Sequence, residues 1–134
     1  MSTLSYFAHS DKGLRERNED SCLAMEKDGV YIFAVAEGMG GPSTGPSAAE
    51  VAVNSLREGG GVSSGSLVEI AESLLACADE ALFHFQEASP ESDPPAVAMT
   101  IALVGPAGEC LVSSPGHRKV FFMPYAPPGG SGAA

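Results

Sequence analysis

The chain has 134 residues, which is enough for one domain with its own core but not for two. Hydrophobic residues make up 44% of the chain and charged residues 18%, a composition typical of a folded globular protein and not of a disordered or membrane-embedded one. Seventeen acidic residues against seven basic ones give a formal net charge of -10, which repels phosphate backbones and anionic lipid headgroups. We therefore expect neither a nucleic acid nor a membrane surface as a partner.

The three cysteines and the N-terminus indicate a cytoplasmic protein. Cys22, Cys77 and Cys110 are odd in number and far apart, so neither a disulfide framework nor a Cys-x-x-Cys metal site is expected, and they are interpreted as buried thiols in a reducing cytosol. The first ten residues lack the basic and apolar regions of a signal peptide, and no stretch approaches the roughly 20 apolar residues that cross a bilayer.

The first third of the chain contains three strand candidates. Leu4–His9 is a short one, followed by the polar segment Ser10–Asp20, whose composition predicts an exposed loop. Ser21–Glu26 is the second, and Asp28-Gly29 is a two-residue hairpin signal that joins it to Val30–Ala36. Because the last run is apolar at every position, it is expected to be a strand buried on both faces.

Two helices are expected in the middle of the chain, after a glycine-rich loop that spans residues 37–46. The first follows Pro46 and places an apolar residue at each position of one helical face, namely Ala49, Ala52, Val53 and Leu56. The second carries a longer apolar stripe from Leu67 to Phe85, and Ser66 with Glu69 three residues later forms the pattern of a capping box.

The last third predicts more strands and then a tail. A hairpin is expected from Val97–Val104 and Glu109–Ser113, and a further strand at Lys119–Met123. Residues 124–134 are expected to form a disordered tail rich in proline and glycine. Strands, two helices and hairpin strands together predict an α+β domain over residues 1–123 with a mainly antiparallel sheet.

Three carboxylates are candidates for metal binding. Glu19 and Asp20 precede one strand of the predicted hairpin and Glu37 closes the other, so they should lie at the same end of neighbouring strands, which are about 4.8 Å apart. Gly38 offers an unobstructed backbone carbonyl, and Arg15 offers a fork of donors suited to phosphate. Such residues could serve a magnesium- or manganese-assisted phosphate hydrolysis, although surface acids are more often simply solvated.

These residues resemble a known family. Arg15-x-x-Asn18-Glu19-Asp20, then an apolar strand into the run that starts Glu37-Gly38-Met39, is similar to the opening of bacterial metal-dependent protein phosphatases of type 2C, the PPM family. The resemblance implies a partial α-β-β-α layered sandwich with two antiparallel helices, in which a metal-bound hydroxide hydrolyses phosphoserine and phosphothreonine. It also implies that Arg15 binds the phosphate of the substrate, and that the partner is a phosphoprotein substrate or a kinase-signalling protein.

The resemblance has gaps that bear on activity. Glu37 stands where the family has aspartate, one methylene shorter, and His117 stands where it has the aspartate of a Gly-Asp-Ser-Arg turn. The family's later metal-binding aspartates are also missing, since no Asp, Glu or His follows Lys119. We therefore expect at most one weak Mg²⁺ or Mn²⁺ site in one copy of the chain, and self-association through uncovered sheet edges as one consequence of a half-sandwich.

Four interpretations remain open at this point. The chain can be an impaired phosphatase domain that binds phosphoproteins, a working phosphatase completed by a second subunit, or a remnant without affinity for metal or phosphate. A fourth, the dinucleotide-binding loop, fits less well, because Gly38-x-Gly40-x-x-Ser43 lacks the third glycine of that motif.

Overall fold

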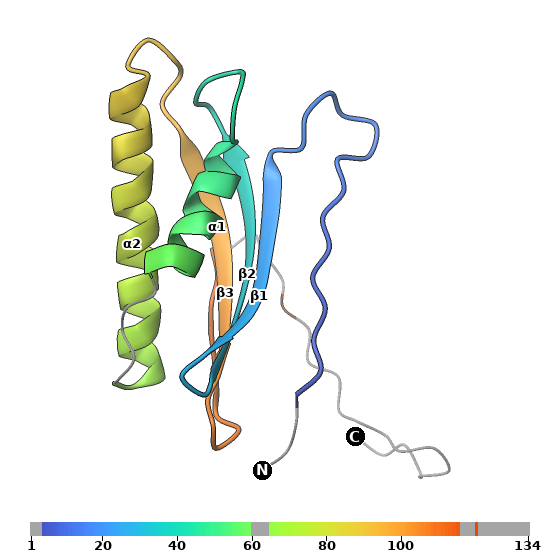
Figure 1. Cartoon of the computed structure of the whole chain (residues 1–134), viewed down its shortest axis with the longest axis vertical. Coiled ribbons are helices and arrows are strands. Elements are labelled where there is room, and N and C mark those ends of the chain that lie inside the picture. The colour runs from blue at the N-terminus through green and yellow to red at the C-terminus, as the bar shows by residue number, and fades with distance from the viewer. Residues whose placement is uncertain (1–3, 60–64, 116–119, 121–134) are drawn as a thin grey trace.

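The computed structural model of the chain describes residues 4–59 and 65–115 together with Val120. These residues form one antiparallel sheet of four strands with two helices packed on one of its faces (Figure 1). The elements in chain order are β1 (Asp20–Lys27), β2 (Val30–Met39), α1 (Ala48–Gly59), α2 (Leu67–Ala88), β3 (Ala96–Val104) and β4 (Cys110–Ser113). The strand order is β1-β2-β3-β4, so the expected α+β class is confirmed.

The hairpin of β1 and β2 sets the position of the candidate site. Asp28 and Gly29 form its turn with φ angles of 51° and 82°, a left-handed pair that suits Asp-Gly. From this turn the register runs to Asp20 opposite Glu37. β2 continues beyond its expected end to Met39, because its last residues also pair with β3, up to Met39 opposite Ala96.

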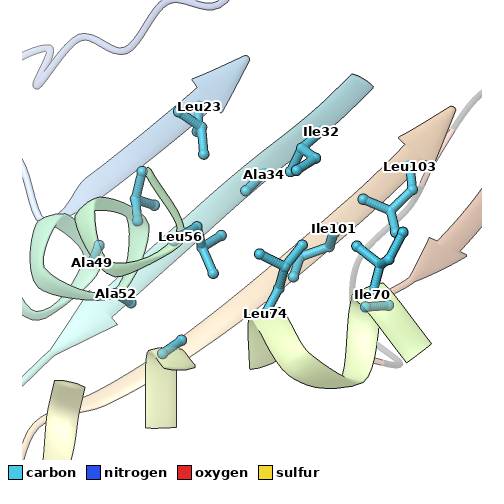
Figure 2. Packing of buried hydrophobic residues seen from close by; sticks show 14 residues of the cluster. Leu23, Ile32, Ala34, Ala49, Ala52, Leu56, Ile70, Leu74, Ile101 and Leu103 are labelled. Carbon is cyan, nitrogen blue, oxygen red and sulfur yellow. The ribbon is translucent and has the colours of Figure 1, made fainter. Parts of the chain in front are cut away.

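The hydrophobic core lies between the helices and the sheet (Figure 2). Leu56 of α1 and Ile101 and Leu103 of β3 are fully buried. Small side chains at Ala34 and Ala52 are also buried in this layer. The rest of the buried cluster comes from Leu23, Ile32, Ala36, Ala49, Val53, Ile70, Ala71, Leu74 and Ala78.

The second face of the sheet, which we call the open face, carries the alternate residues of the same strands. On β2 it presents Tyr31, Phe33, Val35 and Glu37, because side chains alternate between the two faces of a strand. Val35 is 50% exposed, so the expectation that this strand is buried on both faces is wrong. The helices cover only one face.

The segment from Leu4 to His9 is not a strand, contrary to expectation. Instead, the ring of Tyr6 packs edge-on against Tyr31 and Phe33 of the open face, with ring centroids 5.9 and 5.8 Å apart. Phe7, its neighbour, is 86% exposed. Among the described residues, this segment contacts the sheet through the ring of Tyr6 and not through a ladder of backbone hydrogen bonds.

Several other expectations concern the chain ends and the cysteines. The strand expected at Lys119–Met123, His117 and the tail at 124–134 lie outside the described residues, apart from Val120. The capping box at Ser66 and Glu69 is confirmed. None of the three cysteines is fully buried as expected: Cys22 and Cys77 are partly buried, and Cys110 is exposed on the edge strand. Among the described helices, neither is long and apolar enough to cross a membrane.

Candidate functional site

Asp20 and Glu37 form the centre of the candidate site. They are direct partners in the register of β1 and β2, so both side chains leave the sheet on the open face. Residues directly opposite in an antiparallel pair have Cβ atoms about 4.5–5.5 Å apart. The expectation that one carboxylate from each strand lies at the same end of the hairpin is therefore confirmed for this pair.

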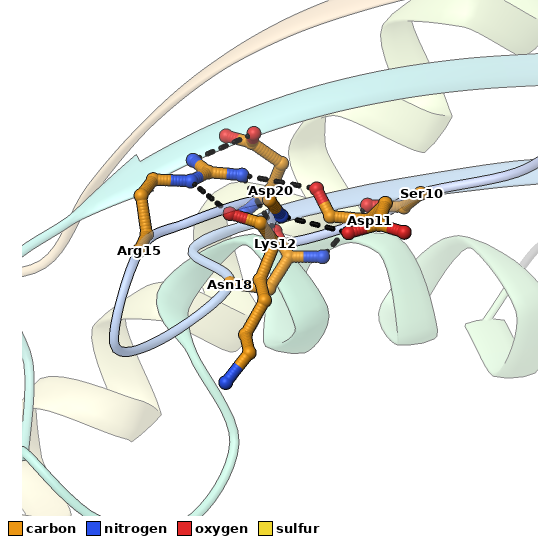
Figure 3. Close-up of polar contacts among 7 residues, drawn as sticks. Ser10, Asp11, Lys12, Arg15, Asn18 and Asp20 are labelled. Carbon is orange, nitrogen blue, oxygen red and sulfur yellow. Dashed lines mark hydrogen bonds and ion pairs between the residues drawn. The ribbon is translucent and has the colours of Figure 1, made fainter.

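Arg15 lies beside Asp20 in the loop that leads into β1 (Figure 3). Its Nη1 atom is 3.0 Å from Oδ2 of Asp20, and the two side chains are 49% and 37% exposed. Its Nε donates to the carbonyl oxygen of Lys12 at 2.8 Å, and Nη2 donates to the carbonyl oxygen of Asp11 at 3.2 Å and to Oδ1 of Asn18 at 3.4 Å. The loop thus folds around the guanidinium group.

Asn18 stabilises the same loop from its other side. Its Oδ1 atom accepts from the amide of Asp20 at 3.0 Å, and its Nδ2 donates to Oγ of Ser10 at 2.9 Å. The Asn-x-Asp spacing thus orders the backbone directly in front of β1.

A hollow of about 410 Å³ lies at this end of the open face. We call it the Asp20–Glu37 hollow; its walls are formed by Arg15, Asp20, Glu37 and Val35, and by His9, Ser10, Asp11, Ser21, Cys22 and Ala36. It brings together the guanidinium and two carboxylates that the sequence singled out. A space of this size is large enough for a phosphate group with a hydrated cation.

Glu19 and Gly38 are joined by a backbone hydrogen bond next to the hollow. The carbonyl oxygen of Glu19 accepts from the amide of Gly38 at 2.8 Å, which extends the β1–β2 ladder by one step. Neither residue is part of the lining of the Asp20–Glu37 hollow. A Cβ atom at position 38 would come within 2.8 Å of the amide nitrogen of Ala49, so glycine there permits α1 to start close to β2.

The glycine loop is also shaped by packing. The amide of Gly41 donates to the carbonyl oxygen of Asp93 at 2.7 Å, and a Cβ at position 41 would lie 3.0 Å from the ring of Phe85. Position 40 has a φ of 74° and faces the backbone of Pro94. These glycines fit the loop against the end of α2 and the segment that follows it.

Arg17, which the sequence analysis missed, does not line the hollow but supports the loop beside it. Its Nη1 donates to the carbonyl oxygen of Pro42 at 2.9 Å and its Nη2 to that of Gly45 at 2.8 Å. It therefore clamps the loop that carries Arg15 to the glycine loop. The sequence signal that could have found it is the second arginine in Arg15-Glu16-Arg17, since two carbonyls on a bent loop suit the guanidinium fork.

The donor set fits a hard divalent cation, but only weakly. Within residues 4–59, 65–115 and 120, no group of three or more His, Cys, Asp or Glu side chains is arranged to hold a metal ion. Asp20 and Glu37 offer two carboxylates on one face of the sheet. Mg²⁺ keeps several waters and is usually bound through one or two carboxylates together with substrate phosphates, so this pair fits that pattern.

Comparisons with known proteins assign the chain to no family. No model of a protein family matches it. A search of curated proteins also finds no match.

Proposed function

We propose that the chain is a PPM-type, type 2C phosphatase-like domain that binds the phosphate group of phosphoserine or phosphothreonine proteins and hydrolyses it slowly or not at all. The observation that carries this proposal is the convergence of Arg15, Asp20 and Glu37 on one hollow of the open face. The resemblance of the motif that contains these residues to the opening of the type 2C family adds to it.

Each residue has a distinct part in the proposed chemistry. Arg15 binds and orients the phosphoryl oxygens, because its planar fork of donors matches them. Asp20 and Glu37 hold a single Mg²⁺ or Mn²⁺, whereas Glu19 and Gly38, which do not line the hollow, support the strand ends through their backbone hydrogen bond. When bound, such a cation neutralises phosphoryl charge and acidifies water.

The impaired activity follows from the number of ligands. A two-metal phosphatase centre holds its ions about 3.5–4 Å apart, and this requires more carboxylates than one opposed pair can supply. Within the described residues the hollow presents Asp11, Asp20 and Glu37 as its only acids, and the three side chains are not arranged to hold a metal ion together. One weakly held cation is the expected limit, with a dissociation constant of about 1 mM, comparable to the weakest calcium sites.

Calorimetric titration of the purified chain with MnCl₂ and with O-phosphoserine tests the proposal. Heat of binding for both ligands is expected, together with loss of Mn²⁺ binding in Glu37→Gln. Glu26→Gln is the matched control, because Glu26 is an exposed acid on the same face at the other end of β1. If neither ligand gives heat, the proposal is refuted and the interpretation of the chain as a remnant without affinity for metal or phosphate remains.

Turnover of p-nitrophenyl phosphate with Mn²⁺ tests the impaired activity separately. Rates close to the buffer blank are expected at all protein concentrations. Rapid turnover by the wild type that is abolished in Glu37→Gln would refute the expectation of impaired activity. A specific rate that rises steeply with protein concentration would instead support completion of the site by a second copy.

A further inference from the structure

β4 covers only part of the outer edge of β3. It pairs with Ile101–Val104, whereas β3 begins at Ala96 and pairs with β2 along its whole length. Continued past the last residue of β4, the register would place Pro115 opposite Met99, and a proline has no N–H to donate to the carbonyl oxygen there. Within the described part of the chain, the outer edge of β3 from Ala96 to Met99 therefore has no neighbouring strand.

The backbone groups of Val97 and Met99 point toward this edge. In an antiparallel ladder, alternate residues of a strand direct their N–H and C=O groups to the same neighbour. The amide of Gly105 donates to the carbonyl oxygen of Glu109 at 2.8 Å, so the odd-numbered residues of β3 face the side of β4. Gly38, the partner of Val97 on β2, donates away from β3, which gives the same assignment.

An apolar groove of about 340 Å³ lies beside this edge, between β3 and α2, which runs along the β3 side of the sheet (Figure 1). We call it the α2–β3 groove. Leu75 and Leu82 of α2 and Val97 and Met99 of β3 form its apolar walls, and Asp79 is the one charged residue among the described residues that line it. Leu82, Val97 and Met99 also pack against the core. The groove is therefore a flank of the core that β4 leaves uncovered.

The helix that forms one wall of the groove is acidic. α2 contains no Lys or Arg, and its acids are Glu69, Glu72, Asp79, Glu80 and Glu87. All of them are exposed. Such a surface attracts a basic partner, and it repels a second copy of a chain whose net charge is -10.

We propose that the α2–β3 groove binds an extended segment of a partner protein, in which apolar residues alternate with polar ones and are followed by a Lys or Arg. The segment adds an antiparallel strand to β3 in the line of β4, with backbone hydrogen bonds to Val97 and Met99. Its apolar side chains enter the groove and its basic side chain meets Asp79. The groove shares no lining residue with the Asp20–Glu37 hollow, so this inference does not rest on the proposed function.

Fluorescence anisotropy with a labelled peptide of sequence Lys-Val-Thr-Val-Thr-Lys tests the added strand. Its two Val residues and its last Lys share one face. Residues that exchange hydrogen bonds across an antiparallel pair have side chains on the same face, so the Val amides should bond to Val97 and Met99. N-methylation of both Val amides should weaken binding about tenfold or more, whereas N-methylation of both Thr amides should not.

Hydrogen exchange on the full chain locates the bound peptide. The amides of Val97 and Met99 should exchange more slowly with the peptide present, whereas those of Ala98 and Thr100, which face β2, should not change.

Two variants test the charge at the rim of the groove. Asp79→Asn should weaken peptide binding about twofold to fivefold at low salt, as expected for an exposed ion pair. Glu72→Gln is the matched control, because Glu72 is an exposed acid of the same helix that does not line the groove, and it should bind the peptide like the wild type.

Three outcomes would overturn the proposal. The first is no saturable binding of the peptide, and the second is an equal loss of affinity in both methylated peptides. The third is a dimer of the chain alone in sedimentation, with the amides of Val97 and Met99 already protected, since it would assign the edge to a second copy.

Discussion

Gly40 and Gly45 offer a matched pair of substitutions in the glycine loop. Both have a left-handed backbone, with φ angles of 74° and 81°, which costs an L-residue about 1–2 kcal/mol. A Cβ atom at position 40 would also collide with the carbonyl of Pro94, whereas position 45 has open space around it. Overpacking against backbone costs about 1–3 kcal/mol more.

Gly40→Ala should therefore lower the free energy of unfolding by about 2–5 kcal/mol and Gly45→Ala by only about 1–2 kcal/mol. Urea unfolding followed by circular dichroism measures both. The free energy of unfolding falls by about 2 kcal/mol per M urea, so an additional destabilisation of about 2 kcal/mol in Gly40→Ala separates the two unfolding midpoints by about 1 M urea. Equal midpoints would refute the argument that packing against Pro94 selects glycine at position 40.

Three further substitutions test the core, a helix cap and the loop clamp. Ile101→Ala, in the fully buried centre of β3, should lower the free energy of unfolding by about 2–5 kcal/mol in urea unfolding. Ser66→Ala removes the capping box of α2 and should cost about 1 kcal/mol, seen as a lower thermal midpoint. Arg17→Ala should speed hydrogen exchange of the amides in the glycine loop, whereas Arg57→Ala, whose guanidinium contacts Asn54 of its own helix, should leave them unchanged.

Local patterns predicted much of the fold because the signals were short-range. Asp28-Gly29 fixed both the turn and the register of the first hairpin, and the structure places Asp20 opposite Glu37 as that register requires. The apolar stripe and the capping box likewise predicted α2 from its first turn. In each case the residues that carry the pattern are neighbours along the chain.

Expectations that depended on distant contacts were less successful. The apolar run at β2 suggested burial on both faces, but only one face of the sheet is covered by helices, so Val35 is exposed. Leu4–His9 has strand-like composition, yet Tyr6 packs across the sheet instead. At the candidate site, the sequence pattern singled out Arg15, Asp20 and Glu37, which line one hollow, but also Glu19 and Gly38, which do not. The contact between Arg15 and Asp20 and the clamp by Arg17 depend on how the loops bend.

The strand order has a consequence for how the chain reaches its native state. β1 and β2 are joined by a tight turn, and an isolated hairpin forms in about 1–10 μs. β2 and β3 are neighbours in the sheet but are separated in the sequence by both helices. Contacts that close such long loops form slowly. We therefore expect Asp20 and Glu37 to come together early in folding and the glycine loop to become ordered late. Alanine substitutions in the first hairpin should then mainly slow refolding, whereas those in β3 should mainly accelerate unfolding. Stopped-flow kinetics measures both rates.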